Sequence, residues 1–534
     1  MSDSGPSSYH PASIPPPSTL PPPPGVRHVI AVVGGRGGVG ASSLSINLGV
    51  YLAQLGRKVL LIDADPTGAE LHTLLGLELP PLPDTDEDPD DLEIAPLQTR
   101  VPGLVLLPQG YRVGSTLPIR PGRKPRWARR LRQLNVDYVL LDLGAGTAPS
   151  TLDLFLTADQ GVCVTTPEPP SVEATYRFLS AVFLRSVRRS LVEDRYRMRL
   201  VERAQSELGA LPSPLHLVRT IARYDSAVSA RAAAELAQLR PRLVVNNVRL
   251  RTDSDLGPAM VDMARRYLGV KLDYVGHIEQ DDAVWLSVVR RRPLLIDSPT
   301  SKSARNTERI ARRILALASA RSELRSEPPL PIIAEEPNLY DVLWTHRGAT
   351  DEELRRAYKR QRDIYTPGSL PLTSLLGEEE LKREQARIEE AHETLLDPLR
   401  RKAYDASVFR EDTSSPPRAP MPRDAALEAE RALLRQELSR EISAETEFTG
   451  RLLGKVREAQ GIEIEDIAKH TRISIAHLKA IESEAFSELP ALVYTRGFVQ
   501  QLAKFLKLDP TQVSRTYLHR MREAVSRPDE ESSS

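Results

Sequence analysis

A glycine-rich stretch between two apolar runs constrains the fold of this chain more than any other feature. HVIAVV (28–33) is short, apolar and β-branched, as expected of a buried strand. Leucines recur every four residues in SSLSINLGVYLAQLG (42–56), which predicts a helix, and KVLLIDAD (58–65) predicts a second strand. The residues between the first strand and the helix read GGRGGVGA (34–41). This order predicts a phosphate-binding loop, because closely spaced amides and a helix N-terminus then face an anion.

The segment RGGVGAS (36–42) resembles the deviant Walker A loop of the MinD/ParA ATPases, whose pattern is KGGxxGK[ST]. The signature lysine of that family, which reaches across a dimer to the partner's nucleotide, falls on Arg36. The P-loop lysine falls on Ala41, and the hydroxyl that binds magnesium falls on Ser42. The resemblance implies that nucleotide is held by the following residues: Gly35, Gly37, Gly38, Val39, Gly40, Ala41 and Ser42.

Three acidic residues and one asparagine match further parts of the family pattern. Asp63 and Asp65 lie in LLIDADP, like the switch I acids of the family, the second of which helps to position the attacking water. Asp142 in VDYVLLDLGAGT matches the Walker B acid, and Asn246 in RLVVNNVR matches the asparagine that recognises adenine. The resemblance therefore implies a site for ATP and Mg²⁺. The implied metal residues are Ser42, Asp63 and Asp142. The implied catalytic residues of an active enzyme are Asp65 and Arg36.

The resemblance continues to Ser298, over about half of the chain. It implies an α/β fold with a mostly parallel sheet and helices on both faces. The segments LLDLGAGT, TPEPPSVEATYRF and VRRRPLLID look like the flagellar-number and polarity branch of the family, the FlhG/FleN-like proteins.

Ala41 is the main departure from the family pattern. A P-loop lysine supplies a point charge to the β- and γ-phosphates, and phosphoryl transfer depends on positioning and charge stabilisation. Groups of this kind contribute about 3 to 4 kcal/mol, which a methyl group cannot supply. We therefore predict a pseudo-ATPase that is impaired in nucleotide binding. The alternative is a slow switch ATPase in which the planar guanidinium of Arg36 and the hydroxyl of Ser42 serve the phosphates.

The composition excludes several classes of protein. The chain has 72 Lys and Arg and 72 Asp and Glu, so no net charge attracts it to nucleic acid or to an anionic membrane. Its single cysteine, Cys163, excludes an intramolecular disulfide and a multi-cysteine metal site, and the apolar run around it predicts a core position. No apolar run approaches the roughly 20 residues of a membrane helix, and residues 1–26 lack the regions of a signal peptide. We expect a cytoplasmic protein without a transmembrane segment.

A second module follows the linker 321–336. Its landmarks YDVL, ATDEELRRAY, IEEAHETLLDP and RKAYD resemble a J-domain over 337–409. A capping-box pattern that begins at Thr350 and apolar residues at helical spacing predict a helical hairpin. A working J-domain carries HPD between its long helices to stimulate a DnaK-type chaperone, whereas this loop reads TPG (366–368). We therefore predict a hairpin that docks protein rather than a cochaperone.

The last module, 448–525, resembles the helix-turn-helix domain of RodZ-like proteins, including its closing YTRGFVQQLAKFLKLDP. The recognition helix is expected near 474–486. Its charged residues are Lys479, Glu482 and Glu484, so it lacks the cations and bidentate donors that DNA reading requires. Protein binding is therefore favoured, with DNA binding as the alternative. The residues at core spacing for five helices are Leu452, Val456, Ile464, Ile467, Ala468, Ile473, Leu478 and Ile481.

The chain is thus expected to contain one α/β P-loop domain and two small all-α domains. The expected ranges are 1–26 for a disordered proline-rich tail, 27–320 for the MinD/ParA-like domain, 321–336 for a linker, 337–409 for the J-like hairpin, 410–424 for a second linker, 425–447 for a charged helix, 448–525 for the helix-turn-helix domain and 526–534 for a disordered tail.

Two of the three modules lack a residue central to catalysis or stimulation. We therefore predict a bacterial scaffold or regulator of spatial organisation, in polarity, motility or division, that acts through protein partners. A homodimer is compatible with this prediction. A slow ATP-dependent switch and a DNA-binding transcriptional regulator remain the alternatives.

Overall fold

The computed structural model describes residues 28–65, 68, 70–78, 96–108, 135–320, 338–409, 435, 438, 442 and 446–526. Within them lies an eight-stranded sheet with the strand order β3-β4-β2-β5-β1-β6-β7-β8. The strands are β1 (His28–Gly34), β2 (Val59–Asp63), β3 (Leu97–Gln98), β4 (Leu104–Leu107), β5 (Tyr138–Ala145), β6 (Gln160–Thr165), β7 (Arg242–Val248) and β8 (Asp273–Glu279). Neighbouring strands are parallel, except that β3 is antiparallel to β4. The mostly parallel α/β fold expected from the sequence is confirmed.

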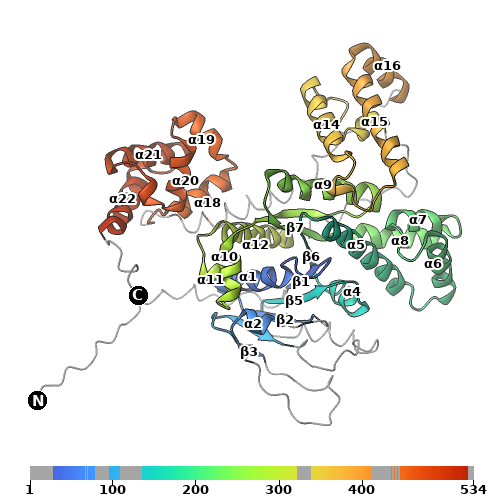
Figure 1. Ribbon diagram of the computed structural model, residues 1–534, viewed down its shortest axis with the longest axis horizontal. Coiled ribbons are helices and arrows are strands. Elements are labelled where there is room, and N and C mark those ends of the chain that lie inside the picture. The colour runs from blue at the N-terminus through green and yellow to red at the C-terminus, as the bar shows by residue number, and fades with distance from the viewer. Residues whose placement is uncertain are drawn as a thin grey trace, which may run out of the picture.

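Helices cover both faces of the sheet (Figure 1). Val29, Ala31 and Val33 of β1 contribute to the core on one face, and Ile30 and Val32 contribute to the core on the other, as the two-residue period of a strand requires. The helices of the first core are α4 (Pro149–Phe155), α5 (Pro169–Ser190), α7 (Pro214–Ala222), α8 (Ser226–Gln238) and α9 (Leu256–Met263), with α6 (Arg195–Leu208) packed on α7. Those of the second are α1 (Ala41–Gln54), α2 (Leu71–Leu74), α10 (Asp282–Val289), α11 (Leu294–Asp297) and α12 (Lys302–Ala320).

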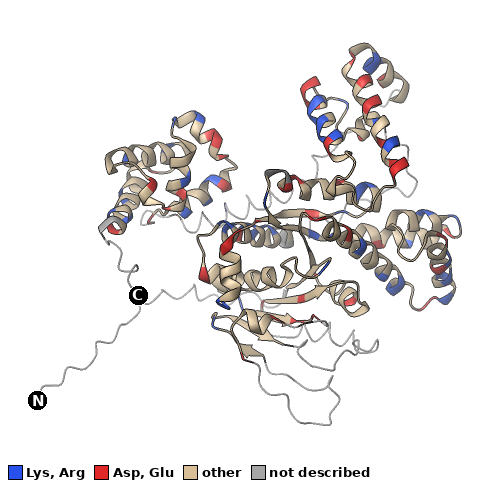
Figure 2. Cartoon of the chain, in the orientation of Figure 1, with Lys and Arg blue, Asp and Glu red and all other residues tan. Residues whose placement is uncertain are grey.

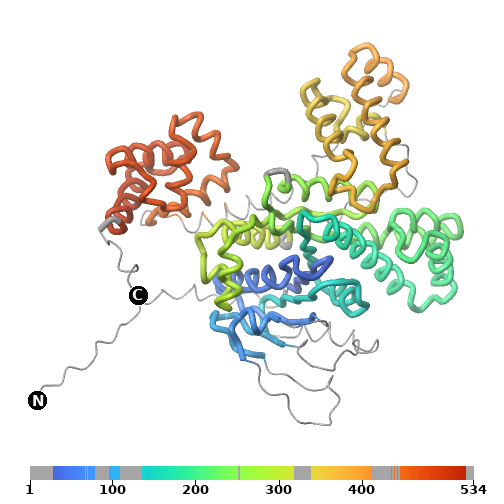
Figure 3. Tube along the Cα trace, viewed as in Figure 1, coloured from blue at the N-terminus to red at the C-terminus, as the bar shows by residue number. Residues whose placement is uncertain are grey.

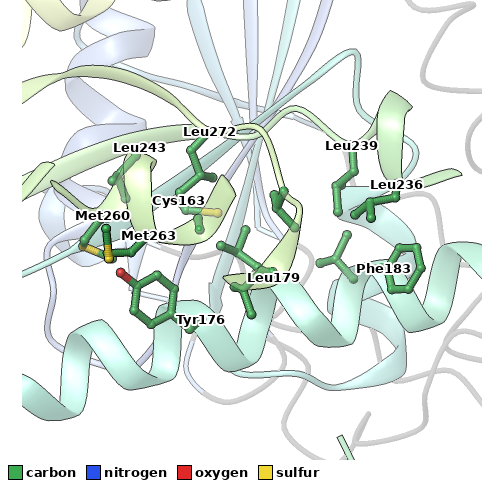
Figure 4. Packing of buried hydrophobic residues seen from close by; sticks show 14 of the residues in the cluster. Cys163, Tyr176, Leu179, Phe183, Leu236, Leu239, Leu243, Met260, Met263 and Leu272 are labelled. Atoms are coloured by element: carbon green, nitrogen blue, oxygen red, sulfur yellow. The ribbon is translucent and has the colours of Figure 1, made fainter. Parts of the chain in front are cut away.

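The first core is dense and apolar around the only cysteine of the chain (Figure 4). Cys163 of β6 is buried against the side chains of α5 and α9, which include Tyr176, Leu179, Met260 and Met263. Burial raises the pKa of the Cys163 thiol. The cysteine is therefore a core residue, as the apolar run around it predicted.

The strand order brings residues that are distant in sequence to one edge of the sheet. β1 lies between β5 and β6, and β5 also pairs with β2. Asp142 of β5 is in register with Asp63 of β2 and with Val32 of β1. The carboxyl ends of these parallel strands therefore meet where the glycine loop leaves β1, and open α/β sheets bind ligands at such an edge.

Residues 338–409 form the predicted helical hairpin with short flanking elements (Figure 3). The elements are α13 (Leu339–Val342), α14 (Asp351–Ile364), the 3₁₀ turn η5 (Leu370–Leu372), α15 (Glu378–Leu396) and α16 (Pro398–Val408). The capping box is present: the Thr350 hydroxyl accepts from the Glu353 amide at 3.3 Å, and the Glu353 carboxylate accepts from the Thr350 amide at 2.8 Å. The buried residues between the two long helices are Leu354, Ala357, Ile388, Ala391 and Leu395, whereas Tyr358 is only partly buried.

Residues 446–526 form a helical unit around its own core. Its elements are α18 (Gly450–Gln460), α19 (Ile464–Thr471), α20 (Ile475–Ser483), the 3₁₀ turn η6 (Phe486–Glu488), α21 (Leu492–Phe505) and α22 (Pro510–Ser526). The five predicted helices are present, and the recognition helix expected near 474–486 is α20, which the Ser474 hydroxyl caps at the His477 amide. The eight predicted core residues are buried, except that Ala468 is partly exposed.

Several expectations lie outside the described residues. They concern the tail 1–26, the tail 526–534 apart from Ser526, which ends α22, the linkers 321–336 and 410–424, and most of the charged helix 425–447. Among the helices of the described segments, none combines the length and the apolar character needed to cross a lipid bilayer.

Candidate nucleotide site

The glycine loop joins β1 to α1, and its last glycine is the N-cap of that helix. Gly40 has a φ of 87°, in the left-handed region that favours glycine, and no side chain caps the first turn of α1. The side-chain amide of Asn246 donates to the Val39 carbonyl at 2.8 Å, and a Cβ at Gly40 would collide with that amide. Asn246, which lies at the end of β7, therefore holds the apex of the loop.

At the two positions where the family carries lysines, this chain has Arg36 and Ala41. Ala41 is buried at the start of α1, and its carbonyl accepts from the Ser45 hydroxyl at 3.0 Å. The Arg36 guanidinium forms an ion pair with the Glu168 carboxylate at 3.3 Å, and both side chains are about half-exposed. Exposed pairs of this kind contribute about 1 kcal/mol or less, so Glu168 holds Arg36 only weakly.

Three carboxyl groups lie close together at the carboxyl end of β2, in β5 and in the segment after β2. Asp63 accepts from the Leu71 amide at 3.0 Å, while its second oxygen, Oδ1, is buried without a hydrogen-bond partner among the described residues. Burial, followed by the nearby charge of Asp142, raises the pKa of Asp63 to about 7. The carboxylate of Asp65 lies against the Cα of Gly144, where a Cβ would collide with it. The site therefore brings three acidic groups close together, and their proximity and burial raise the pKa of two of them.

Asp142 is held more firmly than Asp63. Its carboxylate accepts from the Ser45 hydroxyl at 3.3 Å and also receives hydrogen bonds from the Ser42 hydroxyl and the Gly144 amide. Burial raises the pKa of Asp142 to about 6, although these hydrogen bonds oppose the rise. Ser45 was not predicted from the sequence, but its position one helical turn after Ala41 places it on the same inner face of α1.

The residues present fit a magnesium–nucleotide pair better than a bare metal ion. The orphaned Oδ1 of Asp63 and the Ser42 hydroxyl are oxygen donors of the kind that Mg²⁺ takes, and Mg²⁺ usually completes its shell with water and substrate phosphates. In the described part of the chain, no group of three or more His, Cys, Asp and Glu side chains is arranged to hold a metal alone. Ser42, Asp63 and Asp142 would thus hold the ion together with a nucleotide, which would bring charge neutralisation to the site.

Comparison with known proteins identifies the family of the α/β domain. A family model described as an iron-transfer P-loop NTPase of the ParA group matches residues 25–188, one described as a DnaJ domain matches 338–405, and one described as a helix-turn-helix domain matches 452–513. The septum site-determining protein MinD of Synechocystis is 32% identical over 182 residues, which are 33% of this chain and 68% of that protein. The chain belongs to the MinD/ParA family.

Other family members match at different lengths. The antiactivator FleN of Pseudomonas aeruginosa is 25% identical over 289 residues, which are 54% of this chain and 85% of FleN. Iron-sulfur cluster carrier proteins from several bacteria are 31% to 35% identical, over only 40% to 43% of their own length. The MinD structure of Pyrococcus horikoshii with Mg-ADP aligns at 20% identity and a TM-score of 0.35, over 56% of this chain and all of that chain.

In this MinD/ParA family member, the loop of the J-like module packs on the α/β domain. Tyr365, which precedes the Thr366–Gly368 segment, is fully buried, and its hydroxyl lies 2.7 Å from that of Tyr267. Tyr267 belongs to the π-helical turn η3 (Ala264–Leu268), which continues α9. The Tyr176 hydroxyl of α5 donates to the Pro371 carbonyl of η5 at 2.7 Å. Residues 366–368 themselves stay exposed, but both flanks of the loop are anchored.

A cation between two aromatic rings reinforces this contact. Arg266 of η3 forms an ion pair with Glu384 of α15, and both side chains are less than one-fifth exposed. The Arg266 guanidinium lies 5.7 Å from the ring centroid of Tyr267 and 5.6 Å from that of Tyr365, within cation–π range. The J-like module is therefore fixed to the MinD/ParA domain by a buried polar and aromatic contact. Its sequence gave no sign of this contact, since the partners are about a hundred residues apart.

The recognition helix of the last module does not present its acidic residues freely. Glu482 forms a bidentate pair with Arg457, with a shortest distance of 2.6 Å, and Glu484 pairs with Arg520 at 3.0 Å and accepts from the Gly450 amide. The charges that the sequence places on this helix are therefore not all available to a ligand. Both glutamates are neutralised by arginines within the module, which a charge count along one helix could not reveal.

The helix-turn-helix module also contacts the MinD/ParA domain. The Glu458 carboxylate of α18 accepts from Arg309 at 3.0 Å and from Arg312 at 3.1 Å, both on α12. A second pair joins Arg451 to Glu308 at 2.5 Å. Burial alone would raise the pKa of Glu458, but the neighbouring arginines, Arg309 and Arg312 first, lower it below its usual value. α12 packs in turn on α1, the helix that follows the glycine loop.

Proposed function

We propose that this protein is a MinD/ParA-type scaffold or regulator of spatial organisation in the bacterial cytoplasm, with a nucleotide site that binds weakly and does not turn over efficiently. The proposal rests on one observation: the glycine loop and its polar neighbours are retained, whereas the lysine of the loop is replaced by Ala41. Asn246 orders the loop and Asp63, Asp142 and Ser42 keep the metal side, while Ala41 leaves the phosphates without their lysine.

The balance of charge favours binding without hydrolysis. Backbone amides and a helix N-terminus hold phosphate oxygens in the ground state, so the loop keeps part of its affinity. The transition state needs additional positive charge, and losing one such group typically costs about 3 to 4 kcal/mol. Arg36 is held by Glu168 at the surface and would have to leave that pair to help.

The relatives support a regulatory role rather than metal-cluster transfer. MinD and FleN carry names that refer to septum placement and antiactivation. Iron–sulfur clusters are held by cysteine thiolates, and this chain has one cysteine, which is buried in β6. We therefore propose that this chain has a role related to those of MinD and FleN, in cell polarity, motility or division. We do not propose that it transfers iron–sulfur clusters.

The two helical modules fit protein docking. The J-like loop lacks the HPD residues, and its flanks are committed to the α/β domain. In the helix-turn-helix module, Glu463, Glu465 and Asp466 lie at the start of α19, where DNA-binding modules meet phosphates and acidic groups repel them. Val493 and Tyr494 are exposed on α21 by 80% and 67%, as a protein-contact surface would be.

A nucleotide titration of the full chain tests the proposal. We expect weak binding of Mg-ATP and Mg-ADP that requires Mg²⁺ and weakens further in Asn246→Ala, with phosphate release at the level of the buffer. Glu202→Gln, at an exposed position of α6, serves as the matched control. Robust turnover would support the slow-switch alternative, and absence of binding at millimolar nucleotide would leave a purely structural domain.

DNA binding is the second candidate, because a helix-turn-helix family model matches 452–513. We expect the full chain to bind duplex DNA at physiological salt no tighter than about 10⁻⁴ to 10⁻⁶ M, the usual range of non-specific binding. Sequence-dependent binding in the nanomolar range would favour a transcriptional regulator instead.

A further inference from the structure

A group of exposed apolar side chains lies on α10 and α11, away from the nucleotide loop itself. Trp285, Val288 and Val289 of α10 are 65%, 42% and 57% exposed, and Ile296 of α11 is 39% exposed. The three residues of α10 are spaced i, i+3 and i+4, so they share one face of the helix. Single exposed apolar residues are common on proteins, but a contiguous group with an aromatic residue is typical of an interaction site.

The opposite face of α10 is firmly packed, so the exposure does not result from a loosely held helix. Ala283 and Val284 pack on the core that contains α1 and α12, and Ser287 is buried. The Asp281 carboxylate caps α10 at the Ala283 amide at 3.0 Å and accepts from the Ser303 amide at the start of α12 at 3.3 Å. The apolar face is therefore presented by a fixed helix.

The rim of this face is basic. Arg290, Arg291 and Arg292 follow α10 directly. Arg290 pairs with Asp297 of α11 at 3.2 Å, which ties the two helices together. Arg291 and Arg292 are exposed and make no ion pair with the described residues. Of the acidic residues at the ends of α10 and in α11, Asp281 is a cap and Asp297 is paired, and Asp282 lies at the far end of α10 from the arginines.

α11 is also bonded to the helix that carries the nucleotide loop. The Leu295 amide donates to the buried side-chain oxygen of Asn47 at 3.0 Å, and the Asn47 amide donates to the Ser43 carbonyl at 2.8 Å. Ser43 follows Ser42 in the first turn of α1. A molecule bound to the α10–α11 face would thus rest on elements joined directly to the loop.

We propose that the face formed by Trp285, Val288, Val289 and Ile296, with Arg291 and Arg292 at its rim, docks an acidic amphipathic helix of a protein partner. An amphipathic helix places apolar anchors on such a surface at i, i+3, i+4 and i+7, and a central aromatic residue usually carries much of the binding energy. The two unpaired arginines select carboxylates beside those anchors and exclude a basic partner. This inference goes beyond the proposed function, since it does not depend on nucleotide binding.

The test uses the full chain and a fluorescein-labelled helical peptide with leucines at i, i+3, i+4 and i+7 flanked by glutamates. Fluorescence anisotropy should show binding that weakens about thirtyfold for Trp285→Ala, the loss expected of a hot-spot residue. The double variant R291E/R292E should weaken it by a similar factor and remove its salt dependence. Tyr196→Ala, which changes a 70% exposed aromatic residue on α6, should leave it unchanged.

Four outcomes would overturn the proposal. Equal binding of the same peptide with lysines in place of glutamates would show non-selective adhesion. Binding that Trp285→Ala and R291E/R292E do not alter would place the peptide elsewhere. Self-association of the full chain in sedimentation velocity, lost in Trp285→Ala, would assign the face to a second copy. Binding seen only after the acidic residues of 84–93 are neutralised would assign it to the chain's own acidic stretch.

Discussion

The glycine loop and the loop after α14 have each lost a group that the chemistry of their families requires, but their surroundings differ. Around Ala41, the remaining polar groups are still held in place: Asn246 holds the loop, and Asp142 accepts hydrogen bonds from α1. Around Thr366, the residues on either side have become an interface, with Tyr365 buried and Pro371 bonded to the α/β domain.

The comparison shows that the loss of a functional residue leaves two kinds of site. One kind keeps its geometry and lacks a charge, so a single side chain is expected to restore much of its function. In the other kind, the residues that flank the loop pack against a neighbouring domain. Restored residues would then lie on a loop that is not free to bind a partner. The following experiments separate the two kinds.

The largest expected effect is at the glycine loop. Ala41→Lys should strengthen Mg-ATP binding or turnover by a factor of about 10² to 10³, because it returns a charge-stabilising group that contributes about 3 to 4 kcal/mol. Isothermal calorimetry and phosphate release measure the two quantities. Ala41→Met, which adds length without charge, should have no such effect. If Ala41→Lys also leaves both Mg-ATP affinity and phosphate release unchanged, the loop around Ala41 has not kept a geometry that binds phosphate.

The next effect concerns the J-like contact. Arg266→Met removes one member of the ion pair with Glu384 and should destabilise the contact by about 3 kcal/mol, the low end for buried pairs because neither side chain is fully buried. Limited proteolysis of 338–409 and chemical denaturation would detect the loss. R266M/E384L should recover part of it, since no unpaired charge then remains, and Arg199→Met on exposed α6 is the control. Unchanged protease resistance in Arg266→Met would contradict a fixed module.

A smaller effect should appear as a pH dependence of stability. Because the pKa of Asp63 is raised from 3.8 to about 7 in the folded state, the folded protein retains a proton that the unfolded chain has lost. The free energy of unfolding should therefore fall as the pH rises from about 4 to about 7, and between pH 6 and pH 8 the fall should be about 1 kcal/mol. Denaturation midpoints at several pH values measure it. Asp63→Asn should reduce the slope and leave the smaller contribution of Asp142, whose pKa is also raised. A flat profile in the unchanged protein would mean that Asp63 is not held in this environment.

The smallest expected effect is at the other loop. Thr366→His with Gly368→Asp restores the missing residue types, yet the ATPase rate of a DnaK-type chaperone should stay at its basal value when this variant is added. Gly368 has a φ of 77°, which an aspartate adopts with strain, and the flanks of the loop remain docked. A severalfold stimulation by the variant would show that the loop is accessible and that the two sites do not differ as described.

Local patterns explain what the sequence could predict. The strand–loop–helix unit and the capping box at Thr350 depend on neighbouring residues, and both are present in the structure. The two-faced parallel sheet followed from the resemblance to the MinD/ParA family and is confirmed. The assignments of Arg36, Ser42 and the three acids to nucleotide chemistry stay predictions, although the fold places the loop and the acids at one sheet edge.

Contacts between distant segments explain what the sequence could not predict. Arg36 was considered as a phosphate ligand, but its partner Glu168 lies beyond the next five strands of the chain order. Glu482 was counted among the charges of the recognition helix, whereas Arg457 from another helix neutralises it. In each case the sequence identifies the charged residues of one segment. It does not show which distant segment packs against them and pairs with their charges.

The contact between η3 and the J-like loop has a consequence for how this chain has diverged among its relatives. A hairpin that stands free can drift in sequence or be exchanged without regard to its neighbour. Here Tyr267 and Tyr365 share one hydrogen bond and one arginine, so replacement of either ring leaves the other with an unmatched hydroxyl in a buried position. In an alignment of chains with this architecture, these two positions should therefore change together, while 366–368 should vary without a matching change elsewhere. The hairpin and the α/β domain would then be inherited as one unit. The residues at their contact would be under stronger selection than residues 366–368.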